Sequence, residues 1–576
     1  MSVMEKSTGA GMTAPSWQKR LALSAGWVLL LLVVSWRIWG IQFATNDDAS
    51  MMYLISGAAT GQTEPYIYFM GALYSAPLAW LYRLCDAVPW YTLAYMAAMF
   101  LSCWMICQTV LKKCAAWGRG GWAIGCAVYG VLYGAFYYTA CVRPQFTTIA
   151  ALCGAAALAL LLSAAAEDAK GERWLSRILW AILTLLALNV RYEVGLVTIA
   201  VTLCAIGVRI LLQKNLSWRR GLCAVLALGV LYGLSAAVTA VYKTDDWKAY
   251  EQFNTVRVRF TDYPTAPYGE MESLYVSLGW DQPLYNMVHA WYFLDERVTE
   301  PALATIAEAN QEWLGQEEQV TGLRLSAFFQ ANYWPVYLVY GACAAWLLLS
   351  LAQAILRRPG AWRTALLAHL PSACFVFGGI LLTAFFIWQG RALQRVFDMA
   401  FYVSITPWVL LLPAGAPPKS ARAARWCTGA ASVVLALALL VSAVPQNAER
   451  LPDRTEQYAV TDAVEEYCAA HADLLFIKPG SIAVYYRALS VFTLEKPHNL
   501  LFWGGSMYAS PIYAHQLACN GYQTFSTENL FDENVRFISN GRPTDGMMWY
   551  LQSLYPTAAW EVVDVQETFQ VYRFAR

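Results

Sequence analysis

Long apolar runs recur along the chain from about residue 21 to about residue 444. A helix needs roughly 20 predominantly apolar residues to cross the hydrocarbon core of a bilayer. The first run is long, carries Arg37 near its end and has no small-residue cleavage site behind it, so we read it as a retained helix and not as a cleaved signal. The pattern predicts eleven spans, with bounds Leu21–Ile41, Trp90–Leu111, Gly121–Cys141, Gln145–Ser163, Trp174–Val190, Val194–Leu212, Leu222–Tyr242, Asn332–Leu356, Thr364–Trp388, Asp398–Pro413 and Trp426–Val444.

The Lys and Arg residues beside these runs predict the orientation of the chain. With the N-terminus in the cytoplasm, the inner connections carry eighteen basic residues and the short outer connections carry five. Counting Tyr66–Leu84 as a further span would turn every later basic connection outward. We therefore expect Tyr66–Leu84 to be an interfacial or re-entrant helix on the outer face, with Pro65 at its start. Its aromatic residues, suited to the headgroup layer, are Tyr66, Tyr68, Phe69, Tyr74, Trp80 and Tyr82.

This orientation leaves three segments on the outer side. Two of them, residues 42–89 and 243–331, are outer loops of a transmembrane module that comprises residues 1–444. Residues 243–331 contain fourteen Asp and Glu against six Lys and Arg, which predicts a solvated, folded or half-folded loop. Residues 445–576 are numerous enough for a small extracytoplasmic domain. Its expected elements, of an α/β or α+β type, are helices at Thr461–Ala470 and Gly546–Leu554 and strands at Leu474–Ile477, Trp560–Val565 and Thr568–Phe574.

Composition narrows the class of protein. Hydrophobic residues make up 58% of the 576 residues and charged residues 14%, against about 25% charged in a soluble protein. This excludes a simple soluble enzyme. The 40 Lys and Arg are balanced by 39 Asp and Glu, so no basic field points to a nucleic-acid partner. Most cysteines lie inside apolar runs and form no metal-binding pattern. Cys468 and Cys519 lie in the late polar region, and whether they pair stays open.

The charged residues of the membrane module gather at its outer rim. The middle of each predicted span is almost free of them, whereas an ion-coupled transporter carries acids or broken helices near the midplane. Any chemistry is therefore expected at the outer membrane boundary. The rim residues are Asp47, Asp48, Arg143, Arg191, Glu193, Lys243, Asp245, Asp246, Arg391, Arg395 and Asp398.

Asp47 and Asp48 stand directly after the first span. Two adjacent carboxylates at a membrane surface repel each other and lose hydration, which raises a carboxyl pKa and suits one of them to general-base catalysis. The alternative is that they cap a helix over Ala49–Ala59. The two interpretations are compatible, because one acid can cap the helix while its neighbour reacts.

Arg391 and Arg395 follow the ninth span, four positions apart, on one face if the segment is helical. A pair of guanidinium groups can grip phosphate oxygens in a bidentate way. Anchoring to lipid headgroups is the equally weighted alternative. Arg143 and Arg191 are weaker candidates: either can be a simple anchor, and Arg191 can pair with Glu193.

The layout resembles the GT-C superfamily of membrane glycosyltransferases, in particular the family 39 type with the protein O-mannosyltransferases and the lipid A aminoarabinose transferases. Asp47-Asp48 matches the acid pair that follows the first helix in this family, with Asp47 at the position of the catalytic acid. Glu64-Pro65-Tyr66 resembles the start of the family's interfacial helix, but the family's Lys is absent. Arg143-Pro144, Ala187 to Arg191 and Arg391 to Pro407 resemble other links of the family, and the outer loop 243–331 and the C-terminal domain match no part of it.

The resemblance implies a polyprenyl-phosphate sugar as donor and a reaction on the outer face of the plasma membrane. Asp47 would deprotonate a hydroxyl of a glycan, lipid or protein acceptor, and Arg391, Arg395, Arg191 and Arg143 would hold the donor phosphate. No cofactor is expected, although a divalent metal ion at Asp47 and Asp48 stays open. Two other classes remain: a transporter or flippase for lipid-linked sugars, and a non-catalytic envelope assembly protein.

Overall fold

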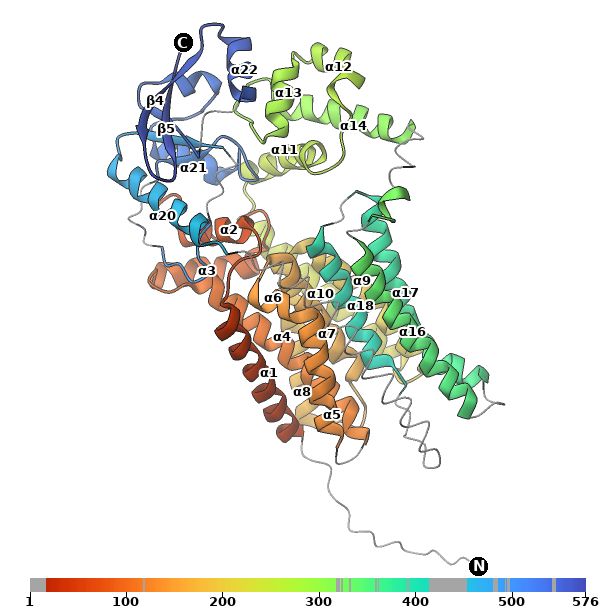
Figure 1. Cartoon of the computed structure of the whole chain (residues 1–576). Coiled ribbons are helices and arrows are strands. Elements are labelled where there is room, and N and C mark those ends of the chain that lie inside the picture. The colour runs from red at the N-terminus through yellow and green to blue at the C-terminus, as the bar shows by residue number, and fades with distance from the viewer. Residues whose placement is uncertain are drawn as a thin grey trace, which may run out of the picture.

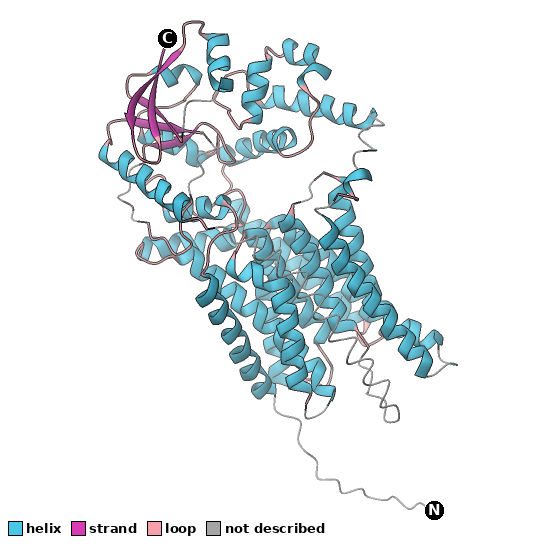
Figure 2. Cartoon of the chain, viewed as in Figure 1, coloured by secondary structure: helices cyan, strands magenta, loops and turns pink. Residues whose placement is uncertain are grey.

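The structure is a computed structural model that describes residues 17–117, 120–316, 322, 325–330, 333–357, 360, 362–390, 393–413, 453–479, 485–492, 494, 498–540 and 545–576. It consists of a long bundle of helices with a cap at one end, and α1 begins at the opposite end (Figure 1). Strands occur in the cap and the bundle is helical (Figure 2).

Nine helical segments among the described residues are long and apolar enough to cross a membrane. They coincide with the first nine predicted spans, so those predictions are confirmed and the chain is a multi-pass membrane protein. The third segment is continuous from Gly121 to Val142 but changes to a π-helical turn at Tyr133–Tyr137. The segments are α1 (Trp17–Trp39), α4 (Trp90–Cys114), α5 with α6 (Gly121–Leu132 and Tyr138–Val142), α7 (Phe146–Ser163), α8 (Lys170–Val190), α9 (Tyr192–Leu211), α10 (Trp218–Tyr242), α16 (Trp334–Arg357) and α17 (Trp362–Trp388).

The tenth predicted span is α18 (Gln394–Leu411), which lies inside the bundle against α7 and α17. Most side chains of α18 are buried, because neighbouring helices cover them. Most side chains of α10, by contrast, are not covered by the protein. At its far end the Lys113 ammonium donates hydrogen bonds to the carbonyls of Val409 and Leu410, at 2.9 and 2.6 Å. These bonds satisfy carbonyls that a helix leaves unpaired at its C-terminus. The eleventh predicted span, Trp426–Val444, lies outside the described residues.

The bundle end opposite the cap carries the basic residues that the sequence assigned to the inner side. Arg20 of α1 pairs with Glu172 of α8 at 2.5 Å, and Lys112 of α4 pairs with Asp168 at 2.6 Å and with Glu172 at 3.2 Å. These ion pairs tie three helices together at that end. The basic residues at this end therefore stabilise the packing of the helices, in addition to being the residues from which the orientation was predicted.

Two short helices, α2 (Asn46–Ser56) and α3 (Ala72–Leu84), lie between the bundle and the cap (Figure 1). The interfacial helix is shorter than predicted, because the chain makes a turn with an isolated bridge between Ile67 and Met70 before α3 begins. Pro65 is therefore not the helix start. The expected aromatic belt is wrong for Tyr66, Tyr74 and Tyr82, which are buried against the protein. The exposed side chains that suit a lipid surface are Trp80, at 59% exposure, and Leu84.

The acidic outer segment is folded. Its α-helices within the described residues include α11 (Asp245–Thr261), α12 (Glu272–Ser277), α13 (Gln282–His289) and α14 (Glu300–Gln316). Side chains from these helices and from the C-terminal region share one hydrophobic core, in which Trp280 and Tyr292 contact the cluster that includes Phe537 and Tyr550. The buried Asp295 accepts hydrogen bonds from Arg297 and from the Tyr550 hydroxyl across this junction. The two outer segments therefore make a single cap.

The C-terminal region is a mixed sheet with helices. Strand order is β2-β1-β3-β5-β4, with β1 parallel to β2 and β3, and β5 antiparallel to β3 and β4. The sequence predicted β1, β4, β5 and two of the helices, and it missed β2, β3 and α21. Cys468 is buried and Cys519 is exposed, and both are free thiols. The elements are α20 (Thr455–Ala470), β1 (Leu475–Lys478), β2 (Leu500–Phe502), α21 (Pro511–Cys519), β3 (Val535–Ser539), α22 (Asp545–Leu554), β4 (Ala559–Val565) and β5 (Gln570–Ala575).

Candidate active site at the cap end of the bundle

The two adjacent acids lie in the first turn of α2. The helix begins at Asn46, and its N-cap residue Thr45 makes no side-chain capping hydrogen bond. The helix therefore starts earlier than the sequence suggested, and the capping role proposed for the acids is wrong in that form. Negative side chains in a first turn still interact favourably with the helix dipole.

Asp48 is completely buried and connects three helices. Its Oδ1 accepts hydrogen bonds from the Tyr95 hydroxyl at 2.9 Å, the Tyr91 hydroxyl at 3.1 Å and the Phe146 backbone N–H at 3.1 Å. Its Oδ2 is buried with no hydrogen-bond partner among the described residues.

Burial raises the pKa of Asp48 to about 8. The hydrogen bond from Tyr95 opposes this shift, and the neighbouring charge of Asp47 adds to it. Asp48 is therefore mostly protonated at neutral pH.

Asp47 faces the opposite way and is accessible, with 36% of its side chain exposed. Its Oδ2 lies 3.6 Å from a guanidinium nitrogen of Arg395, in the first turn of α18. The sequence separates these two residues by more than three hundred positions, and the fold brings them together. In this ion pair the Asp47 carboxylate can act as a base and the Arg395 guanidinium can bind an anion.

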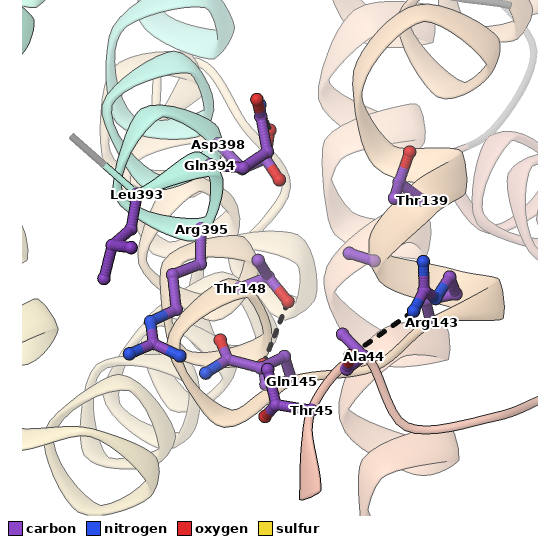
Figure 3. Close-up of a pocket in the computed structure, with 11 residues that line it drawn as sticks. Ala44, Thr45, Thr139, Arg143, Gln145, Thr148, Leu393, Gln394, Arg395 and Asp398 are labelled. Carbon is purple, nitrogen blue, oxygen red and sulfur yellow. Dashed lines mark hydrogen bonds between the residues drawn. The ribbon is translucent and has the colours of Figure 1, made fainter. Parts of the chain in front are cut away.

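Arg395 lines a cavity of ≈ 260 Å³ between α18 and the link from α6 to α7. Arg143 lies in the same cavity and donates a hydrogen bond to the Ala44 carbonyl at 3.3 Å. In Figure 3, Arg395 and Arg143 approach from two sides, with Thr45 and Gln145 between them. The lining residues are Ala44, Thr45, Thr139, Ala140, Arg143, Gln145, Thr148, Leu393, Gln394, Arg395 and Asp398.

Arg191 is outside this set. It pairs with Glu193 at 2.7 Å, as the sequence allowed, and its guanidinium lies over the rings of Phe146 and Phe69, at 4.7 and 5.3 Å from their centroids. Arg391 lies outside the described residues. Of the four arginines named from the sequence, the structure therefore brings Arg395 and Arg143 to one cavity.

Arg454, which the sequence analysis did not select, holds the loop that precedes the two acids. Its side chain is 8% exposed and donates hydrogen bonds to the carbonyls of Phe43 and Ala44, at 3.0 and 2.9 Å. The same loop pairs with the α6–α7 link, because the Ala44 N–H donates to the Pro144 carbonyl at 3.1 Å. Arg454 stands at the start of the C-terminal region, so the cap holds the loop that carries Asp47.

The described residues contain no group of three or more His, Cys, Asp and Glu side chains that could hold a metal ion. Asp47 and Asp48 point to different surroundings, one to Arg395 and one to Tyr91 and Tyr95. The charge that this site can offer to a bound anion comes from its arginines.

Comparison with known proteins gives two solved structures. No family model and no curated protein matches the chain. The chain is similar to ArnT from Cupriavidus metallidurans bound to undecaprenyl phosphate, with a TM-score of 0.39 and 12% identity, over 97% of this chain and 98% of that one. It is also similar to the same protein in the apo state, with a TM-score of 0.40 and 12% identity, over 96% and 98% of the two chains.

Proposed function

We propose that the protein is a glycosyltransferase of the plasma membrane that moves a sugar from a polyprenyl-phosphate donor to an acceptor hydroxyl on the outer face. One observation carries the proposal: an accessible carboxylate, Asp47, lies 3.6 Å from Arg395 at a cavity that a second guanidinium, Arg143, also lines. A base and two anion ligands at the outer end of a membrane bundle suit transfer from a lipid phosphate.

In the proposed reaction Asp47 takes the proton of the acceptor hydroxyl. The acceptor oxygen then attacks the anomeric carbon and inverts it, while the bond from that carbon to the phosphate oxygen breaks. The electron pair of the broken bond leaves on the polyprenyl phosphate. Asp47 returns its proton to solvent before the next cycle.

The leaving phosphate gains negative charge, which Arg395 and Arg143 are placed to stabilise. A guanidinium presents five N–H groups, so Arg395 can face Asp47 with one and a phosphate oxygen with another. Arg391 is proposed as a further phosphate ligand, because it precedes Arg395 by four positions in the sequence. Arg191 is held by Glu193 and two rings, and the proposal assigns it no direct phosphate contact.

We propose that Asp48 positions the start of α2, because its buried carboxyl group joins this helix to α4 and α7. It assigns no metal ion, so treatment with EDTA is expected to leave turnover unchanged. The acceptor is a glycan, a lipid or a protein, and the partners are the bilayer and the lipid-linked donor.

The test is the variant Asp47→Asn, which keeps the side-chain shape and removes the basicity. We expect it to insert and fold normally, to bind a polyprenyl-phosphate sugar, and to lose transfer by about 10²-fold or more, the usual scale for general-base catalysis. Asp245→Asn, at an exposed carboxylate of the same outer side, is the matched control and should keep full activity.

The same variant separates the other two classes. A flippase would retain transport of the lipid-linked sugar when Asp47 is neutralised, and a scaffold would retain envelope assembly. Comparison of cell-envelope glycans by mass spectrometry, with and without the protein, identifies the product. Full transfer by Asp47→Asn would show that the proposed mechanism is wrong.

A further inference from the structure

Gln145 stands immediately before α7 and is 1% exposed. Its side-chain Oε1 accepts the Thr147 backbone N–H at 3.0 Å, and its own backbone carbonyl accepts the Thr148 hydroxyl at 2.9 Å. The first bond is an N-cap, which satisfies one of the N–H groups that a helix leaves unpaired at its start.

This cap fixes the orientation of the amide group. An N–H donor needs an oxygen opposite it, so the Gln145 oxygen faces the helix and the NH₂ group faces away. The amide nitrogen Nε2 is buried and has no hydrogen-bond partner within the described part of the chain. A buried donor without a partner destabilises the folded state, and native proteins seldom retain one without a reason.

The surroundings of this donor favour an anion. Gln145 lines the same cavity as Arg395 and Arg143, and Figure 3 shows its amide turned to the side on which the Arg395 guanidinium lies. The start of α7, an 18-residue helix, adds the positive end of its dipole at this point. The unpaired donor, the two guanidinium groups and the helix end therefore meet in one place.

We propose that Gln145 is a further ligand of the donor phosphate, donating its amide N–H to a phosphate oxygen that Arg395 also contacts. This inference rests on the proposed function, since it names a residue of the same donor site. The helix cap and the phosphate contact use opposite ends of one amide, so forming α7 also orients the donor group.

Two variants separate these two uses of the amide. Gln145→Ser keeps a side-chain oxygen for the Thr147 N–H, so the cap is retained, but its side chain is shorter and lacks the amide NH₂. Gln145→Leu removes both the cap and the donor. Neither variant adds charge to the cavity. If Gln145 only caps α7, Gln145→Ser keeps the preference for the phosphate; if Gln145 binds the phosphate, both variants lose it.

The experiment measures binding of undecaprenyl phosphate and of undecaprenol to the full-length protein in nanodiscs. Wild type is expected to prefer the phosphate, and both variants are expected to lose about tenfold or more of that preference, as for one hydrogen bond to a charged group. Binding of undecaprenol should not change. The thermal midpoint of Gln145→Ser should stay close to that of wild type, because the cap is retained.

The outcomes distinguish the two proposals. If wild type prefers the phosphate and Gln145→Ser keeps that preference unchanged, the inference about Gln145 is wrong and the proposed donor stands. If wild type itself shows no preference for the phosphate over the alcohol, the proposed donor and the inference both fail.

Discussion

Replacing the buried Asp48 with Asn, which has no proton to lose, is expected to stabilise the protein at neutral pH. In Asp48→Asn the side-chain Oδ1 can still accept from Tyr91, Tyr95 and the Phe146 N–H, and an amide NH₂ replaces the protonated oxygen. The variant therefore resembles the protonated form of Asp48, which burial favours. It differs from wild type in having no proton to lose.

The magnitude follows from the two pKa values. The pKa of Asp48 rises from 3.8 to about 8 on burial, so the folded state holds a proton that the unfolded chain releases. The stability of wild type accordingly falls as pH rises from about 4 and levels off above about 8. Between about pH 5.5 and about pH 7.5 the loss is about 3 kcal/mol, and the advantage of Asp48→Asn grows by that amount.

The assay is thermal unfolding of the purified full-length protein in detergent across this pH range. For a chain of this length the difference corresponds to a relative change in Tm of about 3 °C. Asp245→Asn is the control, because its carboxylate is exposed and pairs with Lys248 at 2.8 Å. Its Tm difference from wild type should not grow with pH in favour of the variant.

Two results would refute this reasoning. A Tm difference that moves in favour of wild type as pH rises would mean that the ionised carboxylate stabilises the junction of α2, α4 and α7. A Tm difference that does not change with pH would mean that Asp48 does not take up a proton on folding. Either result would remove the argument that Asp48 is protonated in the folded protein at neutral pH.

Three other predictions concern the site and the topology. Arg395→Lys should weaken binding of polyprenyl phosphate about tenfold, because an ammonium lacks the guanidinium fork; unchanged affinity would identify Arg395 as a surface anchor. Arg454→Met should lower turnover several-fold at unchanged donor affinity, because it frees the Phe43 and Ala44 carbonyls and loosens the loop before Asp47; equal turnover would make Arg454 purely structural. A reporter that is active only in the cytoplasm, fused after Arg576, should be silent, and activity would contradict the predicted orientation.

The sequence alone determined the membrane spans, and it predicted the side of the membrane on which the chemistry takes place. Transfer of apolar residues into lipid depends on local composition, so a run of about 20 apolar residues is sufficient to locate a spanning helix. The same reasoning located the basic end, where Arg20 and Lys112 meet acids of the neighbouring helices. It also singled out Asp47 and Arg395, because charges beside a membrane are few.

The sequence pattern did not predict the short strands of the cap. β2 has three residues and β3 has five, too few for a clear periodicity, and both depend on pairing with β1 from a distant part of the chain. The interfacial helix was placed too early for a related reason. Contact with Asn189, whose carbonyl accepts the Gly71 N–H at 2.8 Å, fixes the chain where α3 begins.

The roles of the site residues were decided by tertiary contacts. Asp47 and Asp48 are neighbours of the same type, yet Tyr91 and Tyr95 of α4 bury one and Arg395 of α18 faces the other. Arg191 and Arg143 looked alike in sequence, and the fold sends the first to aromatic rings and the second to the cavity. The sequence identifies which residues are ionisable. The protonation of such a residue and the groups that it contacts depend on its surroundings in the fold, which residues far away in the sequence supply.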